Sequence, residues 1–119
     1  MAHKLYNLRK LDEIAQGNQD FIREMVVTFI ENVTNEIGSI QSLKLAENWT
    51  AIAETAHKLA SNFAYLGAGS LHALASDIEK SVINDCNLTG IADKTNKLCD
   101  DGLFLVNQLK KDFCIIDAN

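Results

Sequence analysis

Large apolar residues recur at every third or fourth position in the first half of the chain. The run is Ile22, Val26, Phe29, Val33, Ile37 and Ile40. This spacing places them on one face of an α-helix, and Asn18 is suited to cap the start of that helix. The chain contains no proline, a residue that breaks a helix when it lies inside one. We therefore predict a helix from Asn18 to about Ala46 and an all-α fold.

The same periodicity indicates four further helices. We expect a short one over residues 7 to 16, with Asn7 as its cap and Gly17 after its end. Asn48 is expected to cap a helix over residues 49 to 66, and Ser70 the next one. The last helix is predicted over residues 88 to 113, interrupted at Gly102. Their apolar faces are Leu8, Leu11 and Ile14; Ile52, Ala56, Leu59, Phe63 and Leu66; Leu71, Leu74, Ala75, Ile78 and Val82; and Leu88, Ile91, Leu98, Leu105 and Leu109, with Val106 and Phe113 flanking.

The links between these helices are short. Gly67-Ala68-Gly69-Ser70 predicts a tight reversal, and Asn84-Asp85-Cys86-Asn87 a loop. Short links favour antiparallel neighbours. We predict one domain over residues 1–119, an antiparallel up-down-up-down four-helix bundle with a short extra N-terminal helix across one end. Phe21, Met25 and Leu43 lie off the apolar stripe; they either cover the short helix or a neighbour, or form an exposed apolar docking strip.

Charge and composition exclude several classes of protein. Sixteen acidic and eleven basic residues give a net charge of −5, and no basic face suited to nucleic acid stands out. No apolar run reaches the roughly 20 residues that a membrane span needs, and the first residues lack the apolar core of a signal peptide. Three cysteines without metal-site spacing, Cys86, Cys99 and Cys114, predict buried thiols in a reducing cytoplasm.

His57 is the candidate for chemistry. On a helical projection it lies roughly 120–140° from the centre of its helix's apolar stripe, and so on the outer surface. Its neighbours Ala53, Ser61 and Ala64 are small and let a partner approach closely. His72 is expected at the surface or its boundary. Glu54-x-x-His57 also matches the element of di-iron bundles, but those sites need two such elements pointing inward. The chain has one, and it points outward.

The segment around His57 resembles the signature of histidine-containing phosphotransfer (HPt) domains. The residues that carry the resemblance are Ala56-His57-Lys58-Leu59, Leu66-Gly67, Leu71, Leu74 and Ile78-Glu79, and the likeness extends over nearly the whole chain. HPt domains are four-helix bundles that carry phosphate on one exposed histidine between receiver domains. The resemblance implies that His57 is this phosphoacceptor.

The resemblance also implies the partners. A neutral imidazole is a nucleophile through its unprotonated nitrogen, so His57 can take a phosphoryl group from a receiver aspartate and pass it to another receiver. The expected partners are receiver domains of hybrid histidine kinases and response regulators, which supply the aspartate, the magnesium and a lysine. We expect no cofactor in this chain itself. It has no ATP-binding loop, so we expect a phosphocarrier rather than an ATP-dependent kinase. We also expect the protein to be cytoplasmic and monomeric.

Two positions depart from the commonest HPt pattern. Lysine and glycine often stand three and four residues after the histidine, where this chain has Ala60 and Ser61. Ser61 could donate a hydrogen bond to the phosphate. The expected docking surface is Ala53, Glu54, Lys58, Ala60, Ser61, Ala64 and Tyr65. The missing lysine favours an alternative, a binding-only module that docks on a receiver or kinase without carrying phosphate. We expect a stand-alone protein. The alternative that the chain is part of a larger hybrid kinase stays open.

Overall fold

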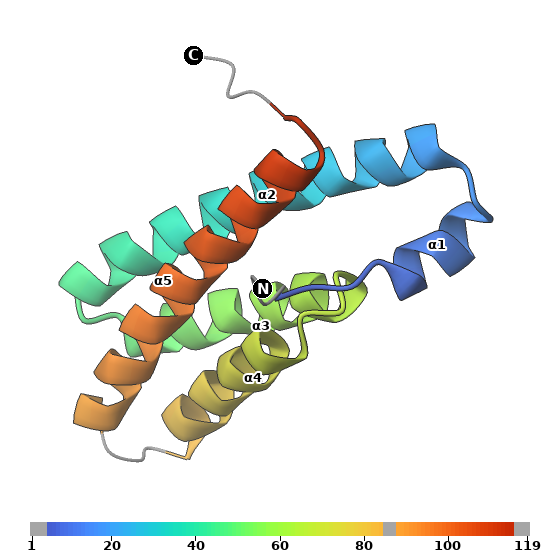
Figure 1. The fold of residues 1–119 in the computed structure, drawn as a ribbon. Coiled ribbons are helices and arrows are strands. Elements are labelled where there is room, and N and C mark those ends of the chain that lie inside the picture. Colours follow the sequence, from blue (N-terminus) through green and yellow to red (C-terminus); the bar gives the residue numbers. More distant parts are fainter. Residues whose placement is uncertain (1–4, 85–87, 116–119) are drawn as a thin grey trace.

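Five helices form the part of the chain that the structure describes, residues 5–84 and 88–115 of a computed structural model (Figure 1). They are α1 (Arg9–Ala15), α2 (Gln19–Leu45), α3 (Trp49–Tyr65), α4 (Gly69–Ile83) and α5 (Leu88–Asp112). No strand occurs among these residues. The predicted all-α fold is confirmed, and the long helices begin and end within a residue or two of the predicted positions.

Two of the four predicted helix caps are formed. The Asn18 side chain accepts a hydrogen bond from Phe21 N at 3.1 Å, and the Asn48 side chain accepts one from Ala51 N at 3.2 Å. The prediction for Ser70 is wrong, because α4 begins at Gly69, and Ala68, two residues before Ser70, takes the cap position without a side-chain bond. Asn7 likewise lies one residue before the cap of α1.

α2, α3, α4 and α5 enclose the core. α2 packs against α3 and α5, and α4 packs against the same two helices, so each of the four has two principal neighbours. Among the predicted apolar faces, the residues that are at most 3% exposed are Leu11, Ile22, Val26, Val33, Ile37, Ile40, Ile52, Ala56, Leu59, Phe63, Leu66, Leu71, Ala75, Ile78, Ile91, Leu98, Leu105, Val106 and Leu109. The stripes read from the sequence therefore face one another across a shared core.

Gly102 does not interrupt α5, contrary to the prediction. It lies buried inside the continuous helix, where a Cβ atom would come within 2.6 Å of Ile37 Cδ1. The absence of a side chain lets α5 approach α2 closely. The prediction was wrong because it weighed glycine's low helix propensity and ignored what the neighbouring helix requires.

The N-terminal segment and α1 lie at the end of the bundle where α3 turns into α4 (Figure 1). Asn7 N donates to Leu66 O at 3.0 Å, Leu5 N donates to the Gln108 side chain at 3.0 Å, and the Tyr6 hydroxyl donates to Asp112. Burial raises the pKa of Tyr6, and Asp112 raises it further. Residues 5–7 thus join α5 to the α3–α4 turn.

Some apolar residues and one thiol are more exposed to solvent than predicted. Ile14 is 46% exposed, because α1 is short and covers the bundle chiefly through Leu11. Met25 and Leu43 pack partly against the core, whereas Phe21 stays 42% exposed. Cys99 is buried, but Cys114 is exposed just beyond α5, contrary to the prediction. Cys86 and the rest of the predicted loop at 85–87 lie outside the described residues. None of the described helices has the length and apolar character of a membrane span.

Candidate functional site

The imidazole of His57 stands on the outer face of α3. Its side chain is 67% exposed, whereas Ala56 and Leu59 on the opposite face are fully buried. Asn48 fixes the start of α3 and Gly67, with φ of +63°, ends it, so the register of the helix is set at both ends. The outward position predicted for His57 is confirmed.

A carboxylate from the neighbouring helix holds one nitrogen of this ring. His57 Nδ1 lies 2.9 Å from Oε2 and 3.2 Å from Oε1 of Glu79 on α4, whose side chain is 26% exposed. An ionised carboxylate only accepts hydrogen bonds, so Nδ1 carries the proton. The lone pair of the neutral ring is therefore on Nε2, the nitrogen available to a partner.

Glu79 was not among the predicted site residues. It follows His57 by 22 positions and comes from another helix, so no periodicity within α3 could reveal it. The signal in the sequence was its place in the Ile78-Glu79 pair of the resemblance. Glu54, the acidic residue three positions before His57, forms no ion pair with Lys58 among the described residues.

Two of the seven residues predicted for the docking surface are buried. Ala53 and Ala60 are each only 6% exposed, because α3 makes its most extensive contact with α4 on that side. His72 on α4 closes part of this seam, with its Nδ1 2.8 Å from the Ala60 carbonyl oxygen. Its side chain is exposed, as predicted. Among the remaining predicted residues, Glu54, Lys58, Ser61 and Tyr65 are exposed and Ala64 is half-buried.

Lys58 lies toward α2, on the other side of α3. Burial raises the pKa of Glu36 above its ordinary value of 4.5 and outweighs two opposing effects, a hydrogen bond of 3.2 Å from Asn62 Nδ2 and the charge of Lys58. Lys58, the residue after His57, is thus close enough to Glu36 on α2 for its charge to affect that carboxyl group.

Glu36→Gln is expected to raise the free energy of unfolding above that of the parent at pH 7, and to raise it less at pH 3.5. A carboxyl group whose folded-state pKa is raised costs stability once pH exceeds that pKa, and this cost disappears as pH falls below 4.5, where folded and unfolded states are both protonated. Urea unfolding of parent and variant at the two pH values measures the difference. An equal effect of the substitution at both pH values would show that burial of the charge is not what matters.

Tyr65 links the exposed side of α3 to an apolar surface on α2. Its ring stacks on Phe29 with centroids 6.0 Å apart, and Lys10 Nζ lies 4.8 Å from the Tyr65 ring centroid. Beside Phe29 is a shallow hollow of about 280 Å³, lined by Phe21, Glu24, Met25, Thr28 and Phe29. Phe21 and Met25, which the sequence left as either core or docking residues, form part of this open surface.

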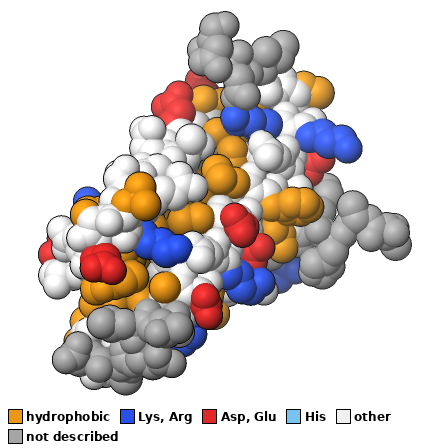
Figure 2. All heavy atoms as spheres, turned by 90° about the vertical axis from the view of Figure 1, so that its left-hand side faces the viewer, with side chains coloured by type: hydrophobic (Ala, Val, Ile, Leu, Met, Phe, Trp, Pro, Cys, Tyr) orange, Lys and Arg blue, Asp and Glu red, His pale blue; other side chains and the backbone are white. Residues whose placement is uncertain are grey.

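A second hollow of about 400 Å³ lies between α3 and α4, on the other side of His57. It is lined by Thr50, Ala53, Glu54, Glu79, Val82 and Ile83. Figure 2 shows a face of the bundle on which charges of both signs alternate with apolar side chains and no described histidine is visible. No group of three or more His, Cys, Asp or Glu side chains suited to a metal ion occurs in the described part of the chain.

A family model described as the Hpt domain matches residues 24–112, about three quarters of the chain. The chain belongs to the Hpt domain family. Hpt domains are phosphocarriers rather than kinases, and they interact with receiver domains of two-component systems. No curated protein and no solved structure matches this Hpt domain significantly. The matched range contains α3, α4 and α5 and most of α2, and with them both His57 and Glu79.

Proposed function

We propose that this Hpt domain carries a phosphoryl group on His57 between two receiver domains of a multistep phosphorelay. The observation that supports this best is the exposed imidazole with Nδ1 bound to Glu79 and Nε2 open to a partner. Such a ring presents one nucleophilic nitrogen in a fixed orientation. Alignment of this kind is the chief requirement of phosphoryl transfer.

The transfer step uses Nε2 as the attacking atom. Its lone pair forms a bond to phosphorus as the bond from phosphorus to the receiver's aspartate oxygen breaks, and the aspartate leaves as a carboxylate. The proton on Nδ1 stays, so the ring becomes positively charged, and the Glu79 carboxylate stabilises that charge. Attack by the aspartate of a second receiver reverses each of these changes. The receiver is expected to contribute the magnesium ion.

The proposal extends to the architecture and the docking surface. We propose a single monomeric domain with the four long helices in up-down-up-down order, which the three-residue links on both sides of α3 support. The receiver would dock around His57 over Glu54, Lys58, Ser61, Ala64 and Tyr65. Ala53 and Ala60 are buried and would lie beneath the contact rather than form it.

The test is transfer of label from phosphorylated receiver domains to the purified chain. Several receivers should be tried, with labelled aspartyl phosphate as the donor. We expect label on the chain that is labile in acid and stable in base, as a phosphoramidate is. If receivers bind but none transfers label, the carrier function is wrong.

Glu79→Ala is expected to slow phosphoryl transfer about tenfold, because a hydrogen bond to a charged group contributes about 1.5 kcal/mol. Glu79→Gln should fall between parent and Glu79→Ala, since its amide oxygen can still accept the Nδ1 proton but carries no charge. Single-turnover transfer rates measure the effect, and ¹⁵N NMR of the ring reports the tautomer. An unchanged rate in Glu79→Ala would remove Glu79 from the mechanism.

The alternative is a binding-only module that docks on a receiver or kinase without accepting phosphate. Ala60, where many Hpt domains have lysine, is the observation that favours it: a buried methyl group offers no charge to a phosphoryl group. Receiver binding that survives with no label on the parent would support this alternative. Gain of label in Ala60→Lys would then identify the missing lysine as the cause.

A further inference from the structure

The hollow between α3 and α4 combines an apolar floor with an acidic rim. Ala53, Val82 and Ile83 provide the apolar surface, and Ile83 at the end of α4 is 70% exposed. Glu54 from α3 and Glu79 from α4 add carboxylates from both sides. An apolar side chain this exposed, next to two carboxylates, is suited to a ligand that is aliphatic along its length and positive at its end.

The described side chains that line the hollow include no cation to balance these carboxylates. Lys58 is not among the residues that line the hollow, and Lys94 is bound to Asp77 at 2.6 Å. Lys80 is next to Glu79 in sequence and so projects about 100° away from it around α4. A phosphoryl group on His57 would add up to about two negative charges to this acidic surface.

We propose that the hollow receives an arginine side chain of the docked receiver domain. The aliphatic stem would pack on Val82 and Ile83, and the planar guanidinium would donate to the carboxylates of Glu54 and Glu79. Glu79 can bind both His57 and the arginine, because two carboxylate oxygens offer about four acceptor positions. This inference rests on the proposed function, and it assigns to the receiver the positive charge that Ala60 does not supply.

The consequence for recognition is that the α4 side of the site selects the partner. Glu79 belongs both to the hollow and to the His57 pair, so an arginine bound there lies beside the reacting ring. Receivers without a suitably placed arginine would leave the Glu54 carboxylate facing their surface without a cation and Glu79 bound to His57 alone. Charge complementarity of this kind discriminates between partners and speeds association.

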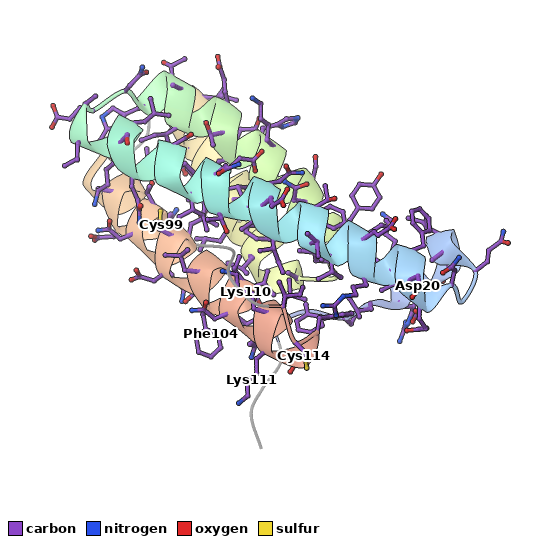
Figure 3. All side chains as sticks on the ribbon, turned by 90° about the horizontal axis from the view of Figure 1, so that it is seen from above. Asp20, Cys99, Phe104, Lys110, Lys111 and Cys114 are labelled. Atoms are coloured by element: carbon purple, nitrogen blue, oxygen red, sulfur yellow. The ribbon has the colours of Figure 1, made fainter. Side chains whose placement is uncertain are left out.

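Ile83→Lys tests this inference by placing a cation in the hollow. The control is Phe104→Lys, which introduces a lysine at another exposed apolar residue, 56% exposed on α5 and pointing away from the bundle (Figure 3). Each variant is labelled in parallel by a phosphorylated receiver and by phosphoramidate, a small donor that needs no docking surface. We expect the ratio of receiver transfer to phosphoramidate labelling to fall about tenfold for Ile83→Lys and to stay at the parent value for Phe104→Lys.

Restoration of transfer identifies the partner side chain. In the receiver that transfers to the parent, each exposed arginine near the aspartate is replaced by glutamate, and one of these variants should recover transfer to Ile83→Lys. An unchanged ratio in Ile83→Lys, or no recovery with any arginine variant, overturns the inference while the carrier function stands. A parent chain that neither donor labels contradicts the proposed function instead.

Discussion

His57→Gln is expected to abolish acceptance of the phosphoryl group. The glutamine amide has no basic nitrogen and cannot form the bond to phosphorus, whereas its size and its ability to donate to Glu79 are kept. His57 is 67% exposed, and substitutions at such positions usually change stability by less than about 0.5 kcal/mol. The measurement is label transfer from a phosphorylated receiver to parent and variant side by side, with urea unfolding to show that both are folded.

His72→Gln is the matched control for this substitution. His72 is also an exposed histidine on the seam between α3 and α4, but its Nδ1 is bound to a backbone carbonyl instead of a carboxylate. We expect His72→Gln to keep the transfer rate of the parent. If label persisted in His57→Gln and disappeared in His72→Gln, the phosphoacceptor would be His72. That result would contradict the site proposed above.

Gly67→Ala is expected to destabilise the fold by about 3 kcal/mol. Gly67 has φ of +63°, and a left-handed conformation costs a residue with a Cβ atom about 1–2 kcal/mol. That Cβ would also lie 2.6 Å from the Asn7 carbonyl oxygen. To relieve the contact, the N-terminal segment must move away and lose the bond from Asn7 N to Leu66 O, at a further cost of about 1 kcal/mol.

Gly38→Ala is the control for this prediction, with the opposite sign expected. Gly38 lies exposed inside α2, with open space where a Cβ would be. Alanine in a helix interior is more stable than glycine by about 1 kcal/mol. Urea unfolding of both variants against the parent measures the two free energies. If Gly67→Ala were as stable as the parent, the contact between Asn7 and the α3–α4 turn would not hold in solution.

The helices could be predicted from the sequence because helical periodicity is a local property. Residues such as Ile22, Val26 and Ile37 are spaced by the helix alone, and the asparagine caps act on their own first turns. Ile14 and Gly102 were misjudged because their surroundings depend on other helices. Burial of Ile14 needs a neighbour that α1 does not provide, and the role of Gly102 is set by Ile37 on α2.

The candidate site, like the fold, was predicted where it depends on one helix and missed where it depends on two. The exposure of His57 follows from the pattern of α3, and the sequence predicted it. Glu79 depends on how α4 is placed along α3, which no projection of a single helix contains. The same contact buries Ala53 and Ala60, so a surface drawn from α3 alone included two residues that α4 covers.

The bonds made by residues 5–7 lie far from the hollow between α3 and α4. They lie at the end of the bundle where α3 turns into α4 and α5 finishes, and Ile115 N is held there too by Lys110 O at 2.8 Å. Thr50 and Ile83, which line the hollow, lie at the other end of the bundle, where α3 begins and α4 ends. The contacts that hold residues 5–7 and Ile115 therefore lie at the end of the bundle opposite to the α3–α4 hollow, so changes in these contacts would not alter the residues that line it.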